Sequence, residues 1–108
     1  MSGTFELTRN SEGHFRFVLK AGNQEVLLRS ELYTSKAAAE AGIASVRANC
    51  SIDERYARKT ASNGQYFFNL KAANHQVIGT SQLFASASLR EQGIARVKAI
   101  GASKIVSA

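Results

Sequence analysis

Apolar and polar side chains alternate along several short stretches of the chain. In the stretch 15–21, Phe15, Phe17 and Leu19 occupy every second position, and the stretch 66–72 repeats this alternation. A period of two with aromatic residues on one side predicts a half-buried β-strand. A polar break and a second short apolar run follow each stretch, so we predict two β-hairpins.

Each hairpin is flanked by further predicted elements. The stretches 4–9 and 55–59 also alternate, which predicts one more strand ahead of each hairpin. Ser35 and Ser86 precede helix-forming runs, and a serine hydroxyl is a preferred helix N-cap. The apolar faces of the two helices consist of Ala39, Ile43, Val46 and Cys50, and of Leu89, Ile94, Val97 and Ile100. Residues 103–107 form a final strand candidate.

The chain contains one pattern twice, offset by 51 positions and without a gap from Gly13 to Ala48. The identical pairs include Phe17 and Phe68, Lys20 and Lys71, Ser30 and Ser81, Leu32 and Leu83, Ser35 and Ser86, Gly42 and Gly93, and Val46 and Val97. Chance does not produce this agreement, so the chain is an internal duplication. Gly42 and Gly93 fall within the predicted helices, which indicates close backbone approach on the packed face.

The predicted fold class is α+β. Each repeat is predicted to be a β-β-β-α-β unit in which the sheet and the helix each have one apolar face. We predict one domain, 1–108, made of repeats 1–51 and 52–108. The apolar faces of both units become buried if the units join into one antiparallel sheet. This sheet would have pseudo-twofold symmetry and both helices on one face.

Four stretches of the sequence resemble the YegP-like family of small bacterial proteins: 15–24, 33–36, 42–46 and 70–78. The resemblance implies tandem β-β-β-α-β units in one sheet, with the C-terminal strands swapped between repeats, and a monomer in place of a homodimer. It implies no activity, catalytic residue or cofactor. The family's Asn-Gly turn is replaced here by Asn23-Gln24 and Asn74-His75. Without the glycine, a tight type I′ turn is less favourable.

Bulk composition adds a basic character. The chain has 44% hydrophobic and 20% charged residues and a formal net charge of +6. This excess favours acidic partners such as nucleic acid, or serves solubility alone. The single cysteine, Cys50, excludes an internal disulfide and fits a reducing compartment. Neither a signal peptide nor a membrane span is recognisable, so we expect a cytoplasmic protein without membrane contact.

No catalytic or metal-binding constellation stands out. His14 and His75 are not equivalent in the repeat, since Gln65 and Gln24 stand at the matching positions. Cys50 has no nearby His or Asp, and no metal-ligand spacing is present. We therefore expect no enzyme and no cofactor. An active site at the junction, near Asp53 and Glu54, is the third and weakest hypothesis.

The remaining candidate is the sheet face turned away from the helices. Strand alternation is expected to bring to this face Arg16, Val18, Lys20, Leu27, Arg29, Arg58, Phe67, Asn69, Lys71, Ile78 and Thr80. The candidate binding residues are Arg16, Lys20, Arg29, Arg58, Phe67 and Lys71. Sheets with basic and aromatic groups bind single-stranded nucleic acid by stacking bases and neutralising phosphates. A protein partner on the same face, or a solvated face without a ligand, stays open at this stage.

Overall fold

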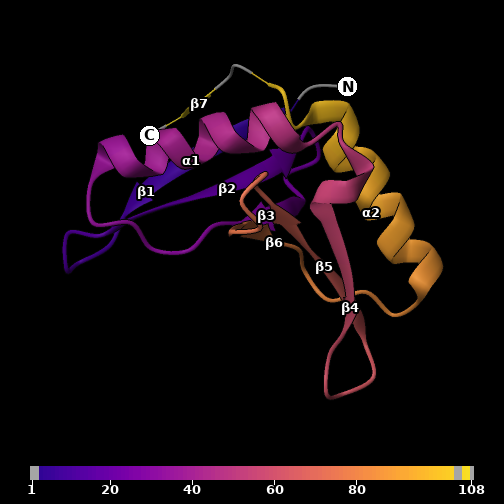
Figure 1. Cartoon of the computed structure of the whole chain (residues 1–108). Helices are drawn as coiled ribbons and strands as arrows, with labels where there is room; N and C mark the ends of the chain where they lie inside the picture. Colours follow the sequence, from indigo (N-terminus) through magenta and orange to yellow (C-terminus); the bar gives the residue numbers. More distant parts are fainter. Residues whose placement is uncertain (1–2, 104–105, 108) are drawn as a thin grey trace.

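The computed structural model describes residues 3–103 and 106–107, and it has an α+β architecture with both helices on one side of a sheet (Figure 1). The first repeat contributes β1 (Gly3–Arg9), β2 (Phe15–Ala21), β3 (Val26–Arg29) and α1 (Lys36–Asn49). The second contributes a 3-10 turn (Asp53–Arg55), β4 (Tyr56–Thr60), β5 (Tyr66–Lys71), β6 (Val77–Thr80), α2 (Ala87–Ile100) and β7 (Val106–Ser107). The predicted fold class is confirmed, and so is the order of elements up to α2 apart from the strand expected after α1.

The strands of the two repeats form one continuous sheet. Among the described residues its order is β4-β5-β6-β3-β2-β1-β7, and each pairing except the last is antiparallel. The two halves meet at β3 and β6 through a single ladder pair, Arg29 with Thr80. The strand β7 of the second repeat lies parallel to β1 of the first, so a C-terminal strand is exchanged between repeats.

The exchange runs in one direction within the described residues. The predicted strand after the first helix does not form: the chain turns after Asn49 and enters the 3-10 turn, where the N–H of Tyr56 donates to the carbonyl of Asp53. Only residues 50–55 separate α1 from β4, too few to cross to a sheet edge and return. Of the predicted final strand 103–107, residues 104–105 lie outside the described residues.

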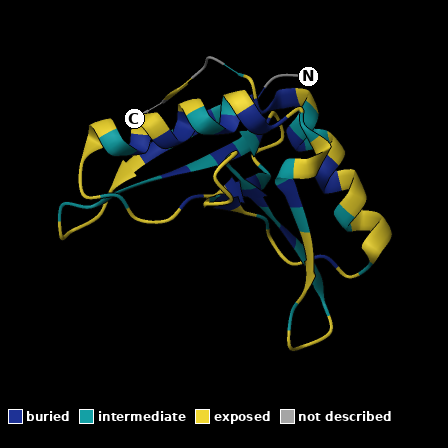
Figure 2. Cartoon of the chain, viewed as in Figure 1, coloured by how far each residue is buried: buried dark blue, intermediate teal, exposed yellow. Residues whose placement is uncertain are grey.

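One buried cluster joins both repeats between the sheet and the helices (Figure 2). Phe5, Phe17 and Phe68 are fully buried, and Phe17 packs edge-on against Phe5 with ring centroids 5.9 Å apart. The predicted close approach of the helix glycines is confirmed. A Cβ on Gly42 would lie 2.5 Å from the Tyr33 hydroxyl, and one on Gly93 would lie 2.6 Å from the Phe84 ring.

The helices begin and pack largely as their sequences predict. The Ser35 and Ser86 hydroxyls each accept a hydrogen bond at 3.1 Å from the backbone N–H three residues on. The predicted apolar faces are buried with one exception, Leu89, whose side chain is 43% exposed. Leu89 lies in the first turn of α2, at the position that Ala38 occupies in α1, so the prediction for this residue is wrong.

In both hairpin turns the residue at the position of the family's glycine has a left-handed backbone conformation. Gln24 has φ 71° and His75 has φ 70°, and the N–H of Gln24 donates to the carbonyl of Ala21 at 2.9 Å. A type I′ turn needs two consecutive residues with positive φ, and here only one has it. The turn is therefore not type I′, and a side-chain-bearing residue occupies the left-handed position in each repeat.

Candidate binding face

The sheet has one face that no helix covers among the described residues (Figure 1). Directly paired residues share a face, so the buried pair Leu7 and Phe17 defines the helix side, and the flanking pair Glu6 and Val18 defines the opposite side. We call this opposite side the open face. It comprises Thr4, Glu6, Thr8, Arg16, Val18, Lys20, Val26, Arg29, Ala57, Lys59, Phe67, Asn69, Lys71, Val77 and Thr80.

The open face is strongly basic. Its cations are Arg16, Lys20, Arg29, Lys59 and Lys71, and its only acid among these residues is Glu6. Five positive charges less one negative give +4, against +6 for the whole chain. The strand positions of the open face therefore concentrate positive charge, although the basic residues are scattered in the sequence.

Five of the six candidate residues lie on this face: Arg16, Lys20, Arg29, Phe67 and Lys71. Two aliphatic residues expected beside them do not. Leu27 is 1% exposed and Ile78 is 7% exposed, and both belong to the core cluster. The physical reason is a β-bulge: Lys20 pairs with Val26 whereas Leu19 pairs with Leu28, which leaves Leu27 as an extra residue that is buried with Leu28.

Arg58, the sixth candidate, lies on the helix side. It pairs with the buried Phe68, and its guanidinium binds Glu91 of α2 at 2.9 Å and Asp53 at 3.1 Å. The placement was wrong by one residue, and a shift of one residue moves a side chain to the other face of a strand. Lys59 takes the open-face position that was assigned to Arg58.

Lys59 was missed although the repeat contained the signal. Tyr56 matches Phe5, so it belongs on the core side, and Arg58 two positions later shares that side. The intervening alternation then assigns Ala57 and Lys59 to the open face. Cross-strand pairing confirms it, because Lys59 stands opposite Phe67.

The acids at the junction between the repeats are held in ion pairs. Hydrogen bonds from Lys98 and then Arg58 hold the pKa of the Asp53 carboxyl below its usual range, and Arg58 does the same to the pKa of Glu91. Lys98 contacts Asp53 at 2.8 Å. A general acid needs the opposite, a carboxyl whose pKa is raised. The arrangement therefore favours a structural ion-pair network over an active site at Asp53.

A cavity of about 380 Å³ lies at the centre of the open face, where the two repeats meet. Its lining comes from both repeats: Val26, Arg29, Ser30, Glu31, Thr80, Ser81 and Gln82. The two serine hydroxyls are already engaged, since Ser30 accepts from the N–H of Phe17 and Ser81 from that of Phe68. Among the described residues Arg29 forms no ion pair, so the cavity contributes its guanidinium to the middle of the face, together with the carboxylate of Glu31.

The remaining candidate nucleophile and metal ligands are dispersed. Cys50 is 1% exposed, burial raises the pKa of its thiol, and the Sγ donates to the carbonyl of Arg47. An unreactive buried thiol is the consequence. Over residues 3–103 and 106–107, no group of three or more His, Cys, Asp and Glu side chains is arranged to hold a metal ion.

Comparison with known proteins agrees with this architecture. The family model for a domain of unknown function, DUF1508, matches the chain twice, at residues 10–56 and 61–106. The UPF0339 protein YegP of Shigella flexneri is 65% identical over 98% of this chain and 96% of its own length. A UPF0339 protein of Acinetobacter baylyi is 57% identical, again over 98% of this chain and 96% of its own length.

Solved structures show the same fold. The solution structure of Escherichia coli yegP, described as a protein of unknown function, has a TM-score of 0.93 and 64% identity over 99% of this chain and 92% of that chain. The UPF0339 protein of Shewanella oneidensis also has a TM-score of 0.93, with 51% identity over 99% of this chain and 91% of its own.

The class of protein is thus a duplicated α+β fold in which two half-sheets share one core. The chain belongs to the YegP-like family of UPF0339 proteins, which is built from the DUF1508 repeat. Where the structure describes the chain, neither helix has the length and apolar character that crossing a membrane requires.

Proposed function

We propose that the protein is a small binding module that takes single-stranded nucleic acid across the open face. One observation carries the proposal: five cations and one acid occupy the strand positions of that face, a net charge of +4 where the whole chain has +6. Phosphate neutralisation with release of counterions is the largest sequence-independent source of nucleic-acid affinity. The sheet supplies this charge from strands of both repeats.

The open face also has groups that contact bases. Phe67 stands beside Lys59 on the neighbouring strand, and the amide of Asn69 lies on the same face. A planar ring stacks on any base, so it adds affinity without demanding a sequence. We therefore expect weak, salt-dependent and sequence-tolerant binding, with no chemical change to the ligand.

The test is a titration with a fluorescent oligothymidylate of about twelve nucleotides at low and moderate salt. If four phosphates are neutralised, the slope of log affinity against log salt is about −3 for a single strand. Absence of binding at low salt, or binding that does not depend on salt, contradicts the proposal.

A matched pair of variants separates the open face from bulk charge. The double variant Arg29→Glu with Lys71→Glu changes the face, and Arg9→Glu with Lys36→Glu makes the same change elsewhere on the surface. Two reversals of two units each lower the net charge from +6 to +2 in both variants. The first should abolish binding at moderate salt, and the second should weaken it only slightly. Equal losses would mean that bulk charge, not the open face, attracts the ligand.

A protein partner is the second candidate, favoured by two exposed leucines. Leu32 is 47% exposed and Leu83 is 48% exposed, and they occupy equivalent positions in the repeats. Packing does not account for their identity, because each is exposed beside a core-packed neighbour, Tyr33 or Phe84. A partner that survives nuclease treatment and is retained by the native chain but not by Leu32→Ser with Leu83→Ser would favour this function.

A further inference from the structure

The two halves of the open face differ in how their equivalent lysines are paired. Lys20 donates to Glu6 at 3.0 Å, so its charge is neutralised within the first repeat. Within residues 3–103 and 106–107 its counterpart Lys71 has no such partner, because Ala57 stands at the position equivalent to Glu6. Of two equivalent lysines, Lys20 is therefore already paired, whereas Lys71 is available to a ligand.

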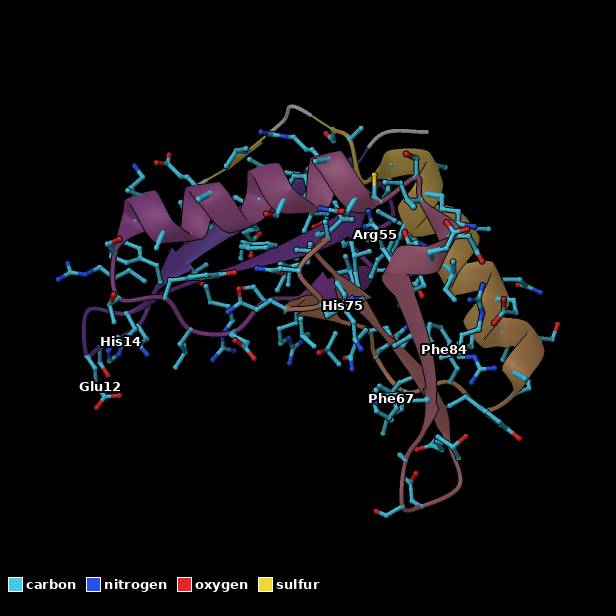
Figure 3. The ribbon with its side chains drawn as sticks, in the orientation of Figure 1. Glu12, His14, Arg55, Phe67, His75 and Phe84 are labelled. Carbon is cyan, nitrogen blue, oxygen red and sulfur yellow. The ribbon has the colours of Figure 1, made fainter. Side chains whose placement is uncertain are left out.

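The second half also carries the aromatic group. Phe67 and Lys59 are directly opposed across β4 and β5, whereas the equivalent pair in the first repeat is Arg16 and Thr8. Phe67 is partly exposed and does not belong to the group of residues packed against the core. Figure 3 shows Phe67 on the hairpin, on the side away from α2, whereas the core residue Phe84 lies toward that helix.

The polar groups of the second half complete a surface without acids. The side-chain Oδ1 of Asn69 accepts from the Thr80 hydroxyl at 2.9 Å, which leaves the amide hydrogens of Asn69 for another acceptor. Among the open-face residues of β4, β5 and β6 there is no carboxylate. The first half has Glu6 on β1, the strand that corresponds to β4.

From these differences we infer that the second repeat alone carries the nucleotide-contacting subsite of the open face. An unpaired base stacks on the ring of Phe67. Lys59, directly opposite the ring on β4, and Lys71, four residues further along β5, take the flanking phosphates, and Asn69 donates to a base or sugar oxygen. The inference rests on the proposed function and deepens it, since it restricts the ligand to strands with an accessible base. No bond is made or broken.

The duplication supplies the matched control for the test. Lys71→Gln and Lys20→Gln remove the same charge from equivalent positions, and affinity for the oligothymidylate is measured for both at low salt. Lys71→Gln should lower the affinity about fivefold, since one phosphate contact is lost, and Lys20→Gln should lower it less than twofold because that charge is already paired.

The role of the ring is tested with a second ligand. Phe67→Leu should lower affinity for the oligothymidylate at least fivefold, because a base loses its stacking platform. The same variant should bind an abasic oligonucleotide of equal length and charge as the native chain does. A ring that served only packing would alter both affinities together.

The outcomes separate the inference from the proposed function. Equal effects of Lys71→Gln and Lys20→Gln, or an unchanged affinity in Phe67→Leu, overturn the inference while binding by the face stands. Failure of the native chain to bind either ligand at low salt overturns both.

Discussion

Cys50 and Gly101 occupy equivalent positions in the two repeats and lie in contact with one another where the two helices end. A Cβ on Gly101 would lie 2.7 Å from the Cβ and 2.9 Å from the Sγ of Cys50. The two residues are the C-caps of α1 and α2, so the pseudo-twofold axis passes between the helix ends. The axis has room for one side chain, which explains why a symmetric position holds two different residues.

Gly101→Ala should therefore destabilise the protein by about 1–3 kcal/mol, the usual cost of overpacking a filled core. Urea unfolding followed by circular dichroism measures it. The double variant Cys50→Gly with Gly101→Ala should be more stable than the sum of the single effects, because it removes the clash with Cys50 and keeps only the 2.7 Å approach of the new Cβ to the Val97 carbonyl oxygen. Simple additivity of the two substitutions would contradict the proposed contact.

The left-handed turn residues offer a stabilising change. Gln24→Gly and His75→Gly should each raise the free energy of unfolding by about 0.5–1 kcal/mol, because glycine adopts φ near 70° without the steric cost borne by other residues. Asn23→Gly is the control, since Asn23 accepts from the N–H of Glu25 at 3.0 Å and should lose stability instead. Thermal unfolding of the three variants checks the order.

The ion-pair network at Arg58 should make the free energy of unfolding decrease as the pH falls into the acid range. Asp53 and Glu91 have pKa values below their ordinary 3.8 and 4.5, so the folded chain binds fewer protons than the unfolded chain in acid. The stability they contribute is present above those ordinary values and is lost as the pH falls through the lowered ones. In Arg58→Gln this loss between pH values of about 6 and 3 should be smaller. Urea unfolding at several pH values measures it, and an unchanged pH slope would contradict it.

Adjacent residues of β4 should separate binding from stability. Lys59→Gln removes an open-face cation and should weaken oligonucleotide binding about fivefold with little change in stability. Arg58→Gln removes the same charge from the helix side, and it should lower stability while leaving binding within about twofold. Paired measurements of affinity and urea midpoint check both. The reverse pattern would mean that the strand presents Arg58 to the ligand.

Sequence reasoning recovered the features that repeat. Phe17 and Phe68, the serine caps and the helix glycines recur at one spacing, so each copy verified the other. The errors fall where local geometry breaks a simple period. A bulge buries Leu27 beside Leu28, and the short path from α1 into β4 replaces a strand by a 3-10 turn. The Lys20–Glu6 pair joins residues from different strands, and only the register reveals it.

The most direct test of the account maps the ligand onto the protein. In a nuclear magnetic resonance titration of the labelled chain with the oligothymidylate at low salt, the amide signals of Lys59, Phe67, Asn69 and Lys71 should shift most. Signals of equivalent residues in the first repeat should shift less, and those of the outer surfaces of α1 and α2 should stay in place. An unshifted open face, or shifts centred on the helices, would contradict nucleic-acid binding by this face.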